Sequence, residues 1–141
     1  VPYQPSVTIT DLKQKDGSIG KVSIDRVSLS CKVYEGATDS SMSKGAGHYT
    51  SSGIYTGNIG LFGHNRGSHA YFAKLKNVKI GDIVEYKTAI GTKTYQVTFV
   101  GSIFYTDYSY LNEMGDNRIT LITCIANQPS LRLCVQAVEI R

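Results

Sequence analysis

The chain has 141 residues, the usual length of one domain, so a second complete domain is not expected. Its 41% hydrophobic and 18% charged residues exclude a disordered chain, and no apolar run approaches the roughly 18–20 residues that span a bilayer. Fifteen Lys and Arg residues against eleven Asp and Glu residues give a net charge of +4 without the clustered basic patch of nucleic-acid binding proteins.

Short runs rich in Val, Ile, Thr and Tyr, bounded by Gly, Asp, Asn or Ser, predict β-strands along the whole chain. In chain order these runs are Val7–Thr10, Gly20–Ile24, Ser28–Val33, Asn58–Phe62, Asp82–Thr88, Lys93–Phe104, Ile119–Cys124 and Leu131–Ile140. Residues 90–92 predict a hairpin turn between the fifth and sixth runs. Many short strands separated by turn signals favour a β-barrel or a β-sandwich.

Two segments predict short helices. Thr38–Lys44 has Thr38 or Asp39 as an N-cap and ends at Gly45, and Ala70–Leu75 follows a capping serine. We therefore expect an all-β fold of about eight strands with one or two short helices.

The run that ends at Cys124 is of particular interest. Alternation along this strand puts Thr120, Ile122 and Cys124 on one face. The next run carries Arg132 on the face opposite its apolar residues, after a short segment that breaks the strand pattern at Pro129. If the two strands are neighbours, Cys124 and Arg132 lie at the same rim of the fold.

The three cysteines, Cys31, Cys124 and Cys134, can neither all pair with one another nor supply four zinc ligands. At least one thiol is therefore free or pairs outside the chain. A free cysteine is commonly a buried, inert residue, and a reactive one needs solvent access and a neighbouring histidine or cation.

The chain offers three histidines and one notable arginine for such a role. His64 follows an apolar strand and a glycine, whereas His48 and His69 lie in segments with no strand before them, and a surface loop position remains open for each. Arg132 interrupts an apolar strand, so it faces solvent, an ion pair or a site. In a site, its fixed donors would hold a substrate carbonyl, stabilise an oxyanion or favour a thiolate.

Residues 120–124 (TLITC) match the T-L-x-T-C signature of sortases, the cysteine transpeptidases of Gram-positive surfaces. Gly63-His64 resembles the histidine motif of that family, and Arg132 lies at the expected short distance after the cysteine. The resemblance extends to residues 45–49 (GAGHY), 57–58 (GN) and 75–82 (LKNVKIGD). The resemblance covers Ile19 to Ile140. The combined order of these segments is specific to the family, whereas T-L-x-T-C alone is a short pattern that can match by chance.

The resemblance implies an eight-stranded sortase-type β-barrel, with residues 1–18 as an N-terminal extension and residues 19–141 as the catalytic domain. It implies a groove that holds His64, Cys124 and Arg132 as catalytic residues, whereas His48 and His69 are not catalytic and the other two thiols are structural. Sortases cleave a sorting motif of the L-P-x-T-G type between Thr and Gly, form a thioester and pass the acyl group to an amine. In that reaction His64 would protonate the leaving amine and Arg132 would stabilise the oxyanion.

The partners implied are secreted proteins with a C-terminal LPxTG-like signal and an amine acceptor in a peptidoglycan precursor or a pilin. The expected location is the extracellular face of a Gram-positive membrane, with an anchor upstream of Val1. The G-x-G-H segment, the chain length, and the lack of a D-P-[FWY] lid or a long insertion before the cysteine strand are most similar to class D sortases. No cofactor is implied, and no metal is expected because calcium needs several carboxylates and the acidic residues are scattered.

Two other functions remain open at this point. One is a non-catalytic surface β-domain, such as an adhesin or a carbohydrate-binding module, which ten tyrosines would suit. The other is a different peptidoglycan cysteine transpeptidase, which resembles the chain less because that family has Gly before its cysteine and Arg two residues after it. Here Thr123 and Ala126 occupy those positions.

Overall fold

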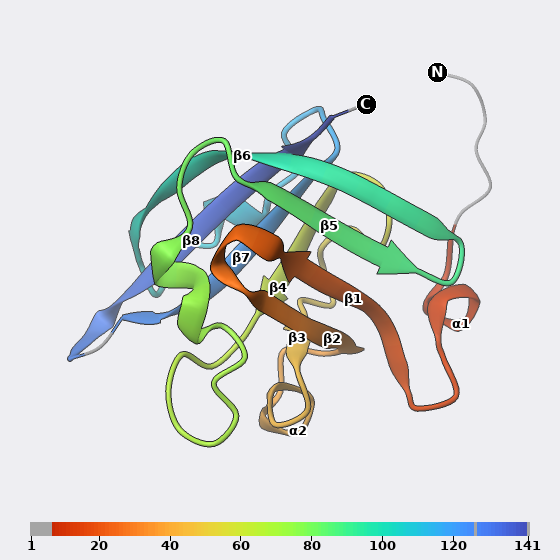
Figure 1. The fold of residues 1–141 in the computed structure, drawn as a ribbon, viewed down its shortest axis with the longest axis horizontal. Coiled ribbons are helices and arrows are strands. Elements are labelled where there is room, and N and C mark those ends of the chain that lie inside the picture. Colours follow the sequence, from red (N-terminus) through yellow and green to blue (C-terminus); the bar gives the residue numbers. More distant parts are fainter. Residues whose placement is uncertain (1–6, 126, 141) are drawn as a thin grey trace.

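The chain forms a closed barrel of eight strands in the computed structural model, which describes residues 7–125 and 127–140 (Figure 1). The strands are β1 (Ser18–Ile24), β2 (Leu29–Glu35), β3 (Ala46–His48), β4 (Asn58–Phe62), β5 (Ile83–Thr88), β6 (Gly91–Phe104), β7 (Arg118–Ile125) and β8 (Gln128–Glu139). Their order around the barrel is β1-β2-β3-β4-β7-β8-β6-β5. The pairs β2–β3 and β4–β7 are parallel and the other neighbours are antiparallel. The expected all-β barrel is confirmed.

The helical segments of the described residues are short, with three to five residues each. They are the α-helices α1 (Ile9–Leu12) and α2 (Asp39–Met42) and the 3₁₀ helices η1 (Asp25–Val27), η2 (Ala73–Asn77) and η3 (Ser109–Leu111). The helix predicted at Thr38–Lys44 is present as α2, and its start is confirmed, since the Thr38 hydroxyl accepts a hydrogen bond from the Ser41 N–H, as an N-cap does. Its last helical residue is Met42, so the predicted C-terminal end is wrong.

Three further predictions about local structure are wrong. Val7–Thr10 is not a strand, because Thr8 and Asp11 exchange side-chain and backbone hydrogen bonds in a capping box that starts α1. The helix expected at Ala70–Leu75 is a 3₁₀ turn displaced to Ala73–Asn77. The turn between β5 and β6 lies one residue earlier than predicted, since Thr88 pairs with Gly91.

The strand β3 was not predicted. It contains three residues, with Gly47 at its centre and Gly45 just before it, so it lacks the β-branched and aromatic run that marks a strand. Close packing explains both glycines. A Cβ atom would lie 2.1 Å from the Lys32 carbonyl oxygen at Gly45 and 2.5 Å from the Gly36 carbonyl oxygen at Gly47.

The main core fills the barrel interior. It consists of alternate residues of the strands, as β5 shows by its strict alternation of exposed and buried positions. Leu12 of α1 is fully buried in the same cluster, so this turn packs against the barrel. A second cluster, of Ile103, Leu111, Ile122 and Cys134, is separate from the first.

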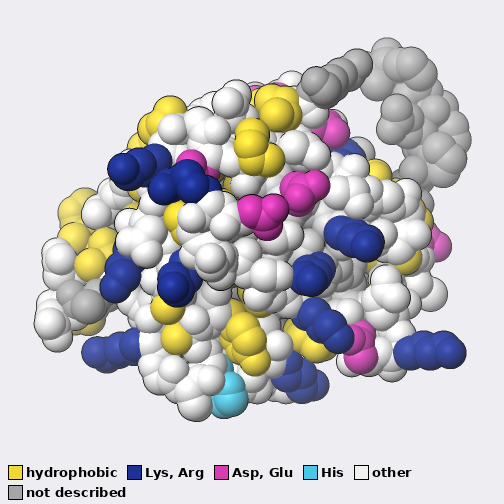
Figure 2. Space-filling view, viewed as in Figure 1, with side chains coloured by type: hydrophobic (Ala, Val, Ile, Leu, Met, Phe, Trp, Pro, Cys, Tyr) yellow, Lys and Arg dark blue, Asp and Glu magenta, His cyan; other side chains and the backbone are white. Residues whose placement is uncertain are grey.

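Charged side chains are distributed over the surface. Figure 2 shows Lys and Arg side chains spread over the displayed face, with Asp and Glu side chains among them. Within the described residues, no helix has the length and apolar character needed to cross a membrane.

Candidate active site

His64, Cys124 and Arg132 lie at the same end of three neighbouring strands. The last pair of the parallel strands β4 and β7 is Phe62 with Ile122, so His64 and Cys124 each lie two residues beyond it. On the other side of β7, Cys124 pairs directly with Arg132 of β8. Side chains of directly paired residues point to the same face. The predicted position of Cys124 and Arg132 at one rim is therefore confirmed.

These three side chains line one hollow of about 340 Å³. The rest of its wall is mostly apolar and comes from Ala37, Met42, Tyr49, Phe62, Gly63, Tyr108, Ile122 and Thr123. Tyr49 stacks on the ring of Tyr108, with 5.9 Å between the ring centroids, and meets Phe62 edge to face. The hollow thus combines an aromatic wall with a thiol, an imidazole and a guanidinium.

Cys124 is the exposed thiol of the chain. Cys31 and Cys134 are free but buried, and burial raises the pKa of each thiol to about 12. Both therefore stay protonated at neutral pH, which makes them poor nucleophiles. The structure agrees with the expectation that these two cysteines are structural.

The position of His64 is fixed by close packing around the preceding glycine. A Cβ atom at Gly63 would lie 2.6 Å from the ring of Phe72, so a larger residue would displace this ring. The Phe72 N–H donates to the His64 carbonyl oxygen over 2.9 Å, and the Thr123 hydroxyl donates to the Gly63 carbonyl oxygen over 2.6 Å. The chain around His64 is therefore tied both to the segment that follows it and to β7.

The backbone at Cys124 leaves the regular ladder. The register with β8 shifts between Cys124 and Ile125, so that residues 129–131 of β8 have no paired residue in β7. The Asn65 side chain donates to the Cys124 carbonyl oxygen over 2.7 Å. Asn65, next to His64 in sequence, thus holds the segment of β7 that presents the thiol.

Arg132 is held by the segment of β8, residues 129–131, that has no paired residue in β7. Its Nη1 donates to the carbonyl oxygens of Pro129 (2.9 Å) and Leu131 (2.8 Å), and its Cζ lies 5.6 Å from the ring centroid of Tyr105. A guanidinium over an aromatic ring at this distance is a cation–π contact. Within the described residues, Nε and Nη2 donate to no protein group. These donors are free for a ligand.

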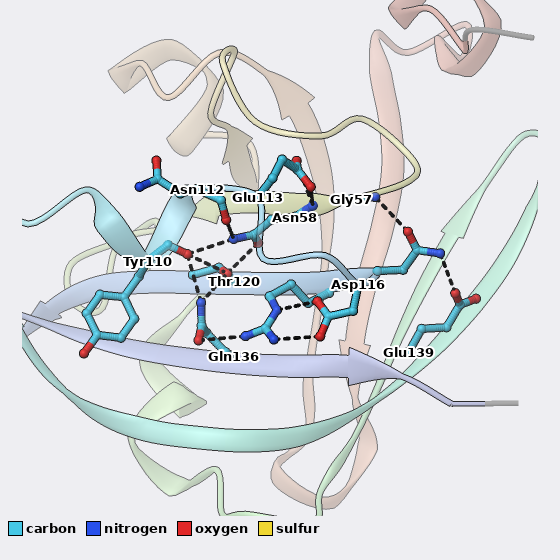
Figure 3. Close-up of polar contacts among 11 residues, drawn as sticks. Gly57, Asn58, Tyr110, Asn112, Glu113, Asp116, Thr120, Gln136 and Glu139 are labelled. Carbon is cyan, nitrogen blue, oxygen red and sulfur yellow. Dashed lines mark hydrogen bonds and ion pairs between the residues drawn. The ribbon is translucent and has the colours of Figure 1, made fainter. Parts of the chain in front are cut away.

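A polar network anchors residues 105–117, which connect β6 and β7 (Figure 3). Tyr108 of this connection lines the hollow. Asn58 of β4 is the centre of the network. Its Nδ2 donates to the carbonyl oxygens of Tyr110 (2.8 Å) and Asn112 (2.9 Å), and its Oδ1 accepts from the Thr120 hydroxyl over 2.7 Å. Gln136 of β8 donates to the same Tyr110 oxygen over 2.9 Å.

Two acidic residues of the connection complete this anchorage. The Glu113 carboxylate accepts from the Asn58 backbone N–H over 3.1 Å, and Asp116 forms a two-point ion pair with Arg118 at 2.7 Å. Thr120, the first threonine of the T-L-x-T-C segment, is fully buried and donates to Asn58 and to the Tyr110 carbonyl oxygen, so it holds the wall of the hollow and does not line it.

The other two histidines lie outside this arrangement. His48 is fully buried, with Nδ1 2.5 Å from Glu35 Oε1, and its Nε2 donates to the Gly53 carbonyl oxygen over 2.7 Å. His69 is exposed. Neither lines a hollow that Cys124 also lines. Over residues 7–125 and 127–140, no three His, Cys, Asp or Glu side chains gather closely enough to hold a metal.

Several residues of the site were not identified from the sequence. Asn65 follows His64 directly in the sequence, so its place next to the predicted histidine could have identified it as a residue of the site. Asn58 was noted only as part of the Gly57-Asn58 segment. Tyr105 and Tyr108 carried no signal, because their place beside Arg132 and Cys124 depends on the path of the connection between β6 and β7.

Comparison with known proteins gives a consistent match. Residues 22–140 match the family model described as Sortase domain. Sortase A of Listeria monocytogenes is 30% identical over 112 residues, which are 78% of this chain and 50% of that protein. The chain spans about half the length of the curated relatives it matches, 50% and 52%.

Solved structures resemble the whole barrel. The lid mutant of Streptococcus agalactiae Sortase C1 gives a TM-score of 0.85 at 26% identity, covering 92% of this chain and 72% of that one. Sortase A of Listeria monocytogenes gives a TM-score of 0.81 at 26% identity, covering 89% of each chain.

Proposed function

The chain belongs to the sortase family, and from this premise we propose that it is a cysteine transpeptidase with Cys124 as nucleophile, His64 as acid and base, and Arg132 as the oxyanion-binding residue. One observation carries the proposal. The exposed thiol at the end of β7 has an imidazole two residues beyond the end of one neighbouring strand, β4, and a guanidinium directly paired with it on the other, β8.

The residues supply a complete acyl transfer. The Cys124 thiolate attacks the carbonyl carbon of the scissile amide, and the C–N bond breaks as protonated His64 donates a proton to the leaving amine. The acyl group is then a thioester on Cys124. An incoming amine attacks this thioester, neutral His64 takes its proton, and the C–S bond breaks to restore the thiolate.

Arg132 contributes fixed donors at the carbonyl. Its Nη1 is occupied by two backbone carbonyls, which fix the plane of the guanidinium and leave Nε and Nη2 for the substrate. Donors that are oriented before the reaction stabilise the charge that develops on the carbonyl oxygen.

The proposed substrates are secreted proteins with an LPxTG-like sorting signal, cleaved between Thr and Gly (or Ala). The apolar hollow beside Cys124 suits an extended peptide with apolar side chains. The acyl group would pass to an amine of the cell wall or of a pilin, at the extracellular face of a Gram-positive membrane to which the whole protein is anchored. The class D assignment rests on the G-x-G-H segment at residues 45–48.

A panel of fluorogenic sorting peptides, with and without amine acceptors, tests the proposal by mass spectrometry. We expect cleavage at the predicted bond and an acyl adduct on Cys124, both absent from Cys124→Ala. Cys31→Ala is the matched control, since that thiol is buried, and it should cleave normally. Absence of cleavage and of any adduct with every peptide would refute the function.

A further inference from the structure

Cys124 lines more than one hollow, and each of these hollows has different other lining residues. Besides the hollow with the aromatic wall, Cys124 lines a second one of about 460 Å³, on the side of residues 65–76. Its walls include Arg66, Lys76, Phe72 and Leu133. A transpeptidase needs two approaches to its thiol, because the acyl group stays on the sulfur while the leaving amine is replaced by another. We call this second hollow the basic hollow.

The positively charged side chains of the basic hollow have no acidic partner among the described residues. Arg66 and Lys76 are both exposed, and among the described residues neither forms an ion pair, whereas Arg26, Lys32 and Arg118 each pair with an aspartate. No Asp or Glu lines the basic hollow. The adjoining hollow of about 490 Å³ also has none, and Arg66 and Arg132 line it.

This charge distribution has two consequences for an amine acceptor. A carboxylate on the acceptor would be attracted to Arg66 and Lys76, which supply donors for it. The same cations disfavour the ammonium form of the acceptor and favour the free amine, because like charges repel. The free amine is the form that attacks a thioester.

We propose that the basic hollow binds the acceptor and selects an amine whose own molecule carries a free carboxylate no more than two peptide units away, as in an amino-acid end group of a cell-wall peptide. An internal lysine of a pilin, whose carboxyl is held in a peptide bond, is disfavoured. This inference rests on the proposed function, because it concerns the second half of the same reaction.

The test measures how the acyl-enzyme partitions between transfer to an amine and hydrolysis. Diglycine and triglycine are compared with their C-terminal amides, and Nα-acetyl-lysinamide represents an internal lysine. The two triglycine acceptors have nearly matched amines, since the carboxylate lies two peptide units away. Because both products come from one acyl-enzyme, their ratio does not depend on how fast that intermediate forms.

We expect the free carboxylates to raise this ratio about threefold to fivefold at low salt, as for exposed ion pairs, and the preference to shrink as salt is added. The double substitution Arg66→Gln, Lys76→Gln should abolish the preference. Lys74→Gln is the matched control, because Lys74 is an exposed lysine of the same turn, η2, that does not line the basic hollow, and it should keep the preference.

Equal ratios for acids and amides, or a higher ratio for Nα-acetyl-lysinamide, would overturn the acceptor inference while leaving the proposed function intact. A preference that survives the double substitution would overturn the role of Arg66 and Lys76. If no acyl-enzyme forms with any sorting peptide, the proposed function fails, and the acceptor inference fails with it.

Discussion

The Thr123 hydroxyl donates a hydrogen bond of 2.6 Å to the Gly63 carbonyl oxygen, and both residues are buried. The bond joins the residue before Cys124 to the residue before His64. Thr123 belongs to β7, and Gly63 directly follows β4, the parallel neighbour of β7. It therefore ties together the two chain segments that carry the thiol and the imidazole.

Thr123→Val keeps the side-chain shape but removes this donor. We expect a loss of about 1–3 kcal/mol in the free energy of unfolding, because the Gly63 oxygen is left unpaired. We also expect a fall in kcat of about 10- to 100-fold from the altered spacing of His64 and Cys124. Denaturant unfolding and steady-state kinetics measure both. Thr123→Ser should restore most of kcat, and equal rates for Val and Thr would contradict this role.

Asn58→Ala should loosen the connection between β6 and β7. Asn58 bonds two carbonyl oxygens of that connection and the Thr120 hydroxyl, so its loss leaves buried polar groups unpaired. We expect about 1–3 kcal/mol of destabilisation and a raised KM for the sorting peptide, since Tyr108 lines the hollow of about 340 Å³ that we propose binds the peptide.

The measurements are kinetics and amide hydrogen exchange at residues 108–112. Asn112→Ala is the control, because only the backbone carbonyl of Asn112 accepts from Asn58. Unchanged exchange at residues 108–112 in Asn58→Ala would refute the anchoring role.

Alkylation should separate the three thiols. Burial raises the pKa of Cys31 and Cys134 to about 12, so at neutral pH iodoacetamide should label Cys124 alone in the folded protein and all three thiols in denaturant. Peptide mass spectrometry locates the label. Folded Cys124→Ala should take up none, and rapid labelling of Cys31 or Cys134 would show that their burial is transient.

Arg132→Ala and Arg132→Lys should both lower kcat about 10²–10³-fold, the usual effect of losing one oriented oxyanion donor. A lysine supplies a point charge on a flexible stem in place of a planar set of donors. Circular dichroism checks the fold. If Arg132→Lys retains a near-normal kcat, the oriented-donor role is wrong, and if only KM rises, Arg132 binds the peptide without stabilising the transition state.

Acid should weaken the fold partly through Asp82. The guanidinium of Arg26 donates two hydrogen bonds to this carboxylate, which holds the pKa of Asp82 below its ordinary value. A carboxyl group with a lowered pKa in the folded state stabilises the fold above its unfolded pKa of about 3.9 and loses this contribution as pH falls through the folded pKa.

Asp82→Asn should therefore lower stability at pH 6 more than at pH 2.5. Urea unfolding at both pH values measures the difference. Asp25→Asn is the control, because no described residue pairs with the Asp25 carboxylate. A loss of stability in Asp82→Asn that is independent of pH would assign the effect to packing instead of charge.

The sequence alone determined those features that depend on neighbouring residues. Alternation gave the face of Cys124 within β7 and of Arg132 within β8, because side-chain direction in a strand has a period of two. It predicted a shared rim on the condition that the two strands are neighbours, which their pairing confirms. The T-L-x-T-C segment, together with the order of the Gly63-His64, Arg132 and G-x-G-H segments around it, indicated the family. The same local view failed at Val7–Thr10, where the capping box of Thr8 and Asp11 outweighs β-propensity, and at β3, which is too short to show a pattern.

Only the tertiary structure decided what surrounds the thiol. His64 lies beside Cys124 because β4 and β7 pair in parallel in a single register. The hydrogen bond between Gly63 and Thr123 joins two residues that are 60 positions apart in the sequence. Closure of the barrel fixes that register, and no local pattern in either strand encodes it. The same holds for Tyr105 beneath Arg132 and for Arg66 and Lys76 on the far side of Cys124, since contacts between distant segments depend on how the whole barrel packs.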